Sequence, residues 1–309
     1  MKVFIAGATG AIGTQLVPRL VAHGHEVVGM TRSESKQAAL RELGAVPVIA
    51  DALDPDEVAG AVAAAAPDVI IHELTALPTI DPRHFDRSFA LTNRLRTEGT
   101  DHLLSAARAV GVARFIAQSY TGWPNSRTGG PVKSEEDPLD PTPVKDMSET
   151  LAAIRHLESV VSGADWTEGI VLRYGAFYGP GTSMWHGGEQ FELVRKRRFP
   201  VVGDGSGVWS FVHIEDAAEA TLLAVEQGER GVYNIVDDDP AAVAEWLPAM
   251  AERLGAPKPW RVPRWVGRLA AGEAGAVLMT EIRGSSNAKA KHALGWSPRY
   301  PSWRQGIVA

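Results

Sequence analysis

KVFIAGATGAIG, residues 2–13, is the stretch that decides the fold. A short apolar run ends in glycines at positions 7, 10 and 13, and an amphipathic helical pattern follows directly. Glycines at such a strand-to-helix junction allow a tight turn and let backbone N–H groups approach a pyrophosphate at the helix N-terminus. We therefore predict a dinucleotide-binding loop whose cofactor contacts are Gly7, Thr9, Gly10, Ala11, Ile12 and Gly13.

Short apolar runs alternate with longer helical patterns through the first 175 residues. The apolar runs are continuous rather than alternating, as expected for strands buried on both faces of a parallel sheet. The pattern predicts an α/β fold, a doubly wound parallel sheet of the Rossmann type. The predicted strands are 2–6, 26–32, 46–51, 68–74, 114–119, 169–175 and 232–236.

The regular alternation of predicted strands and helices ends after residue 175, where glycine-rich and aromatic segments appear. One further clean strand–helix–strand unit lies between residues 208 and 240. We predict a dinucleotide-binding domain over 1–175, to which 208–240 returns. The segments 176–207 and 241–309 are predicted to form a smaller C-terminal substrate-binding lobe.

Composition narrows the range of partners. The net charge of −6, from 37 acidic and 31 basic residues, argues against nucleic acid or an anionic membrane as the partner. The absence of cysteine excludes a disulfide and a thiolate nucleophile. The chain begins directly in a strand, without a signal peptide, so we expect a cytoplasmic protein. His186 and Glu189 lack a third ligand nearby, and no metal site is predicted.

The glycine spacing G-x-x-G-x-x-G resembles the extended and atypical short-chain dehydrogenase/reductases, the NAD-dependent epimerase/dehydratase-like group. The resemblance continues along nearly the whole chain, in the segments VLRYGAFYGPG (171–181), FVHIEDAAEA (211–220), VYNI (232–235) and LGWSPRYPSWRQGI (294–307). It implies a nicotinamide dinucleotide cofactor and a small-molecule substrate. It also implies a homodimer, formed through the helices around 89–110 and 147–162.

The resemblance assigns further cofactor contacts at the ends of the strands. Asp51, with Ala52 beside it, would lie at the adenine, and Leu74 and Thr75 would lie at the ribose. Ser119, at the end of the fifth strand, would complete the cofactor site.

The end of the second strand bears on the choice of cofactor. NAD enzymes usually place an acidic residue here to bind the ribose 2′-hydroxyl, whereas this chain has Thr31, Arg32 and Ser33. A guanidinium suits a 2′-phosphate through charge-assisted hydrogen bonds. We therefore expect NADP(H) in preference to NAD(H), with Arg32 as the discriminating contact.

The catalytic pair that the resemblance implies is missing. Family members use a Tyr-x-x-x-Lys helix, in which the lysine lowers the pKa of a proton-exchanging tyrosine. If Glu158 matches the glutamate of that helix, the two positions fall on Thr150 and Ile154. The same helix is predicted to begin with a capping box formed by Asp146 and Glu149.

Another tyrosine lies where the family places a catalytic serine or threonine. Counted from the fifth strand, that position is Tyr120, and Thr121 follows it. We predict these two as catalytic residues, with Tyr120 as the proton donor. An ordinary tyrosine pKa of about 10 requires a nearby cation, and Lys133 and Lys145 are the lysines between this strand and the helix.

Aromatic residues dominate the predicted substrate site. Trp209 stands where nucleotide-sugar enzymes of the family carry an arginine that grips a diphosphate. Together with Trp123, Tyr178 and Trp185, it predicts an aromatic cleft for an uncharged small molecule.

Three functions remain open from the sequence. The first is an NADP(H)-dependent oxidoreductase acting on a carbonyl or activated alkene of a small, mainly apolar molecule. The second is a nucleotide-sugar epimerase or dehydratase, which Trp209 argues against. The third is a non-catalytic NADP-binding sensor or scaffold, which the missing pair supports and the aromatic cleft opposes.

Overall fold

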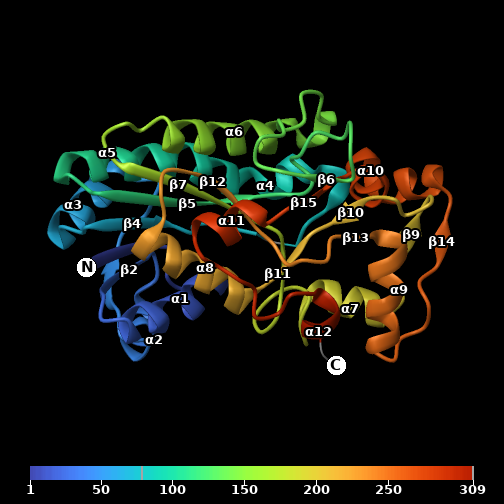
Figure 1. The fold of residues 1–309 in the computed structure, drawn as a ribbon, viewed down its shortest axis with the longest axis horizontal. Helices are drawn as coiled ribbons and strands as arrows, with labels where there is room; N and C mark the ends of the chain where they lie inside the picture. The colour runs from blue at the N-terminus through green and yellow to red at the C-terminus, as the bar shows by residue number, and fades with distance from the viewer. Residues whose placement is uncertain (78, 308–309) are drawn as a thin grey trace.

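A seven-stranded parallel sheet forms the centre of the molecule (Figure 1). The computed structural model describes residues 1–77 and 79–307. The strand order is β12-β7-β5-β4-β1-β2-β3. The strands are β1 (Lys2–Ala6), β2 (Glu26–Thr31), β3 (Val46–Ile49), β4 (Val69–His72), β5 (Arg114–Tyr120), β7 (Glu168–Tyr174) and β12 (Gly231–Ile235). The predicted doubly wound sheet is confirmed.

Side chains alternate along each strand between two separate apolar cores, which explains the continuous apolar runs in the sequence. Val3 and Ile5 belong to the core between the sheet and helices α1 and α8. Phe4 points to the other face, into the core between the sheet and helices α3, α5 and α6. Figure 1 shows α5 and α6 above the sheet and α1, α2 and α8 below it. These helices are α1 (Ala11–Ala22), α2 (Gln37–Glu42), α3 (Pro55–Ala65), α4 (Phe85–Arg94), α5 (Thr100–Val110), α6 (Ser148–Ser162) and α8 (Ile214–Gln227).

The strand order of the sheet indicates where a ligand-binding crevice is expected. Strand order reverses between β1, which leads outward to β2 and β3, and β4, which leads to β5, β7 and β12. Ligands of such sheets bind outside the carboxyl ends of the strands at this switch point. The glycine loop after β1 and the residues that follow β4 and β5 all reach this edge.

A second group of elements packs on its own core at the right of Figure 1. Its fully buried tryptophans, Trp246 and Trp303, anchor this core. Its helices are α7 (Glu189–Arg195), α9 (Val243–Arg253), α10 (Arg264–Thr280) and α12 (Trp303–Gly306). Its short strands are β8 (Ala176–Tyr178), β9 (Val201–Val202), β10 (Val208–Trp209), β11 (Phe211–His213), β13 (Ala241–Ala242) and β14 (Arg261–Val262).

Part of the C-terminal segment packs against the sheet domain instead. The core between the sheet and helices α1 and α8 also contains Ala290, on α11 (Ala288–Ala293), Leu294 and Trp296. A last short pair, β6 (Val132–Lys133) with β15 (Gly284–Ser285), ties the loop after β5 to the chain after α10. Within the described part of the chain, no helix has the length and apolar character needed to cross a membrane.

Candidate active site

The glycine loop forms a close-fitting cradle at the N-terminus of α1. Gly7 has φ +102°, and a Cβ there would lie 2.7 Å from the carbonyl carbon and oxygen of Glu73. A Cβ on Gly13 would lie 2.5 Å from the carbonyl group of Ala8, so this glycine lets α1 pack directly on the loop. Gly10 precedes α1 and has no side chain to cap it. The first N–H groups of α1 are thus free to bind an anion, and the loop fits a pyrophosphate.

The residues predicted at the adenosine end lie together at the ends of β2 and β3. Arg32 is exposed and Asp51 is half-buried, and Arg32 Nη1 lies 3.9 Å from Asp51 Oδ2. Ala52 is buried, and its carbonyl oxygen accepts a hydrogen bond from His102. The Ser33 hydroxyl, beside Arg32, is hydrogen-bonded to that of Ser35 at 2.7 Å. One guanidinium and two hydroxyls therefore face solvent where a ribose would lie.

The end of β4 carries a buried histidine network beside the cofactor edge. His72 Nε2 lies 3.2 Å from Leu95 O and 3.1 Å from Thr100 Oγ1. The backbone N–H of Leu74 donates to His72 Nδ1, which fixes the start of the segment leading to exposed Thr75. Burial lowers the pKa of His72 to about 4, so this imidazole is neutral at physiological pH.

Ser119 belongs to a buried ion-pair network. Its hydroxyl donates to Glu158 Oε1 at 2.7 Å. Arg173 binds the same carboxylate through Nε at 2.7 Å and Nη2 at 2.6 Å. The network joins β5, α6 and β7 and leaves the Ser119 hydroxyl oriented toward α6. Its predicted contact with cofactor stays a prediction.

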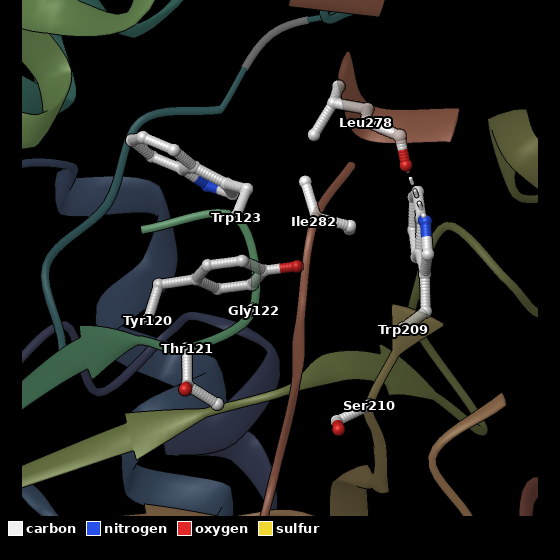
Figure 2. A pocket seen from close by; sticks show the side chains of 8 residues that line it. All are labelled: Tyr120, Thr121, Gly122, Trp123, Trp209, Ser210, Leu278 and Ile282. Atoms are coloured by element: carbon white, nitrogen blue, oxygen red, sulfur yellow. Dashed lines mark hydrogen bonds between the residues drawn. The ribbon is translucent and has the colours of Figure 1, made fainter. Parts of the chain in front are cut away.

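A pocket opens directly after β5 (Figure 2). Tyr120, Thr121, Gly122 and Trp123 line one side, and Trp209, Ser210, Leu278 and Ile282 line the other. Trp209 is held by a hydrogen bond from its indole N–H to Leu278 O at 2.9 Å. The structure thus brings both predicted catalytic residues together with two of the four predicted substrate residues, Trp123 and Trp209.

Tyr120 points its hydroxyl into this pocket, toward Ile282 (Figure 2). Burial raises its pKa to about 12, and the charge of Arg96 acts in the opposite direction. The phenol is therefore protonated at neutral pH, as a proton donor must be. Thr121 is buried, and its hydroxyl lies 2.6 Å from that of Ser285.

The two positions on α6 that were predicted to match the Tyr–Lys pair are buried in the core. Thr150 is fully buried, and its hydroxyl donates to Asp86 Oδ1 at 2.6 Å. Ile154 is also fully buried, among Phe85, Phe89 and other apolar side chains. Neither residue lines the pocket.

The predicted capping box at this helix is wrong. The residue before α6 is Met147, and no side chain from its own segment caps the helix. Instead Asp86, on α4, accepts hydrogen bonds from the backbone N–H groups of Glu149 and Thr150 at 3.1 and 2.9 Å. A carboxylate from a neighbouring helix thus satisfies the free N–H groups.

The two lysines considered as partners for Tyr120 lie elsewhere. Lys133 is buried and binds Asp137 at 3.1 Å, and Lys145 is exposed. The cation that acts on Tyr120 is Arg96, which sequence reasoning missed because nothing in its local pattern marks it as buried. Its exposed fraction is only 6%.

Glu73 is a second residue that sequence reasoning missed. It lies against Gly7, its carboxyl group accepts a hydrogen bond from Tyr174 at 3.1 Å, and Oε2 is buried without a partner among the described residues. Burial raises the pKa of Glu73 to about 8. The group is therefore largely uncharged at neutral pH and does not repel an anion bound at the loop.

Tyr178 and Trp185 do not line this pocket. Tyr178 is fully buried in the second core, where its hydroxyl donates to Tyr300 O at 3.3 Å. Trp185 is partly exposed and packs edge-on against His186. The structure gives Tyr178 a packing role. Among residues 1–77 and 79–307, no cluster of three histidine or carboxylate side chains is placed to hold a metal ion.

Comparison with known proteins identifies the family. The model of the NAD dependent epimerase/dehydratase family matches residues 3–236. This chain belongs to that family. A 3-diazoavenalumate denitrifying reductase from a Streptomyces species is 42% identical over 310 residues, which cover 99% of each chain. A 4-hydroxy-2-methyl-3-oxo-4-farnesyl-3,4-dihydroquinoline-1-oxide ketoreductase from Stigmatella aurantiaca is 28% identical, over 82% of this chain and 74% of the relative.

Solved structures of this epimerase/dehydratase family share the fold. UDP-glucose 4-epimerase from Thermotoga maritima, with UDP-glucose, has a TM-score of 0.78 at 22% identity, covering 99% of this chain and 96% of the other. A human epimerase family protein with NADPH has a TM-score of 0.73 at 22% identity, covering 99% and 98%. The family and the reductases among the relatives make this chain an enzyme with a nicotinamide cofactor, so the alternative of a non-catalytic sensor is set aside.

Proposed function

We propose that this enzyme is an NADP(H)-dependent reductase of a small, mainly apolar molecule, with Tyr120 at the reacting end of the pocket. The observation that carries the proposal is the pocket itself, because it joins Tyr120, Trp123 and Trp209 at the carboxyl edge of the sheet. That edge also holds the glycine cradle, so hydride donor and substrate would meet there.

The chain's own residues supply the cofactor site. The glycine loop and the N-terminus of α1 would hold the pyrophosphate, and exposed Arg32 would bind a 2′-phosphate. Asp51, Ala52, Leu74 and Thr75 would line the adenosine and ribose. When bound, the nicotinamide supplies a hydride.

The pocket argues for a small substrate and against a nucleotide sugar. Its cavity volume is about 20 Å³, far below the roughly 300–1,000 Å³ of pockets for drug-sized ligands, so a substrate would have to widen it to enter. The lining contains no lysine or arginine that could grip a diphosphate, and Trp209 presents an indole instead. The indole rings of Trp123 and Trp209 suit contact with an aromatic substrate once the pocket has widened.

Two classes of hydride acceptor place different demands on Tyr120. A carbonyl or activated alkene, as in the ketoreductase relative, needs a proton or a polarising hydrogen bond as it accepts hydride. An aryl diazonium group accepts hydride as dinitrogen leaves, and it needs no oxygen to be protonated. The second acceptor is favoured by the denitrifying reductase that is 42% identical over 99% of both chains, and by the loss of the Tyr–Lys pair.

The experiment compares NADPH oxidation by the wild type and Tyr120→Phe on two panels of small aromatic substrates. With ketones and enones, we expect the variant to lose on the order of 100-fold or more in kcat, the usual contribution of a positioned acid. With aryl diazonium compounds, we expect both proteins to turn over and to release dinitrogen. Tight binding of NADPH without turnover on either panel, or turnover of nucleotide sugars alone, would overturn the reductase assignment.

A homodimer through α4, α5 and α6 remains part of the proposal. Leu91 on α4 and Val110 on α5 are exposed apolar side chains on these helices, which supports it. Sedimentation velocity of the purified chain checks the assembly.

A further inference from the structure

Ser210 lies between β10 and β11, on the side of the pocket that faces Tyr120 (Figure 2). Its exposed fraction is only 4%. Its backbone is anchored, because the N–H group of Ala176 donates to Ser210 O at 2.9 Å. Buried hydroxyl groups in proteins are as a rule hydrogen-bonded. The partners of this hydroxyl therefore decide what it can do in the pocket.

The Ser210 hydroxyl is fixed as an acceptor but has no close acceptor of its own. Its oxygen accepts a hydrogen bond from the backbone N–H of Ser285 at 2.8 Å. A Cβ on Gly284 would lie 3.2 Å from the same oxygen, so β15 packs closely against it. The acceptor that the described residues offer to the Ser210 O–H is Ser285 O at 3.5 Å, which is long for an O–H···O hydrogen bond. The proton of this hydroxyl is thus free to bind a group in the pocket.

The Thr121 hydroxyl, by contrast, belongs to a closed ring of hydrogen bonds. It lies 2.6 Å from Ser285 Oγ and 3.4 Å from Asn125 Oδ1. Asn125 Nδ2 donates to Ser285 Oγ at 2.9 Å and so completes the ring. Contact between the Thr121 hydroxyl and a substrate would require this ring to open. Ser210 is therefore better placed than Thr121 to donate to a substrate.

The size of the cavity limits what can enter between the two sides without widening it. Its volume of about 20 Å³ is enough for one water-sized group. Tyr120 points its hydroxyl into this space, and Ser210 lines it from the other side. The indole N–H of Trp209 is already bound to Leu278 O. A single oxygen atom in the cavity would come within reach of both hydroxyls.

We propose that Ser210 and Tyr120 together hold one oxygen atom of the substrate, with Ser210 as a second hydrogen-bond donor. In a carbonyl substrate this is the reacting oxygen. As the carbonyl carbon accepts hydride, the C=O π bond breaks and the negative charge moves to this oxygen. Tyr120 gives its proton to the oxygen and is reprotonated by solvent. Ser210 keeps its proton and stabilises the developing charge through its hydrogen bond. The reaction rests on the proposed function, whereas the binding of the oxygen does not.

The first test measures binding without turnover, with NADP⁺ present because it carries no hydride. The probes are acetophenone and α-methylstyrene, which differ only in a carbonyl oxygen against a methylene group. Ligand-observed NMR titrations give both affinities. We expect Ser210→Ala to weaken acetophenone binding roughly 5–10-fold, as loss of one hydrogen bond does, and to leave α-methylstyrene binding unchanged. Equal effects on both probes, or none, would overturn the proposal.

Two further variants separate donation from packing. Ser210→Cys keeps a side chain of similar shape, but a thiol is a weak donor, so we expect it to behave like Ser210→Ala. Ser162→Ala is the matched control. It removes a buried serine hydroxyl that has no partner among the described residues and does not line the pocket. We expect it to change neither affinity.

Crystal structures of the ligand-free wild type and Ser210→Ala check the same site without any probe. We expect a water oxygen within about 3 Å of both hydroxyls in the wild type and its loss or displacement in the variant. A wild-type cavity that is empty, or whose water contacts only one hydroxyl, would overturn the proposal. The confirmed donor pair without NADPH turnover would count against the reductase assignment alone. Turnover of ketones with unchanged binding in Ser210→Ala would count against Ser210 alone.

Discussion

The predicted cofactor end and the predicted proton-transfer end of this site are held in very different ways. At the cofactor end, the glycines are held by backbone geometry, because a side chain at Gly7 or Gly13 would overlap a neighbouring carbonyl group. At the other end, Thr150 and Ile154, the positions predicted for the Tyr–Lys pair, are fully buried. The predicted cofactor cradle thus rests on backbone geometry, whereas the predicted positions of the pair are packed core.

The difference has a physical origin. The N-terminus of α1 binds a pyrophosphate through N–H groups that any sequence with the correct turn provides. A proton relay depends on individual pKa values, which change with one buried charge or one lost partner. In this chain the proposed proton donor is Tyr120 on β5, whose pKa burial raises to about 12.

The largest expected effect comes from placing a lysine at residue 154, the position predicted for the lysine of the pair. Ile154→Lys would bury an ammonium group among Phe85, Phe89 and Leu151. We expect a loss of at least about 3 kcal/mol in the free energy of unfolding, because a charge without a partner replaces a packed side chain. Urea denaturation followed by tryptophan fluorescence measures it.

Ala152→Lys is the control for that change, since Ala152 is exposed on the same helix. We expect its stability to stay within about 0.5 kcal/mol of the wild type. If Ile154→Lys is as stable as the control, residue 154 is open to solvent rather than in the core, and the contrast between the two ends is lost.

Glu73 lies between the two ends and makes stability depend on pH. Its pKa of about 8 lies above the ordinary value of 4.5, so between these values the folded protein holds a proton that the unfolded chain has released. The free energy of unfolding therefore falls as pH rises through this window. His72, with its pKa lowered to about 4, acts in the opposite sense, but only below about pH 6.5.

We expect Glu73→Gln to reduce the loss of stability between pH 6.5 and 8 by about 1–2 kcal/mol, since one pH unit is worth up to about 1.4 kcal/mol per proton. Some loss will remain, because burial also raises the pKa of Asp237 to about 8. Thermal unfolding across this pH range measures the slope. Exposed Glu42→Gln should keep the wild-type slope, and an unchanged slope in Glu73→Gln would show that Glu73 ionises normally.

The fold and the cofactor end could be predicted because their signals are local. The strand, glycines and helix of residues 2–13 form one continuous pattern, and continuous apolar runs follow directly from burial on both faces of the sheet. The pocket residues Tyr120, Trp123 and Trp209 could be proposed because a strand end and a family position marked them.

The positions of Arg96, Asp86 and Tyr178 could not be predicted correctly, because they depend on packing between segments far apart in the sequence. Arg96 looks like a surface arginine between Arg94 and Glu98, but it is buried where the π-helical turn η3 (Leu95–Gly99) packs against α6. Asp86 caps α6 from another helix, and no sequence spacing connects the two. Tyr178 was predicted in the cleft from its aromatic character, which serves equally well in the second core.

The smallest effect concerns cofactor choice, where Arg32 is exposed and only loosely paired with Asp51. We expect Arg32→Ala to weaken NADPH binding roughly tenfold, or about 1.4 kcal/mol, because it removes a charge-assisted contact to the 2′-phosphate. NADH lacks this phosphate, so its affinity should stay the same. Exposed Lys36→Ala, close by in the 3-10 turn before α2, controls for general loss of positive charge. Titration calorimetry with both cofactors measures the difference. Equal losses for NADPH and NADH would place Arg32 on a part that the two cofactors share.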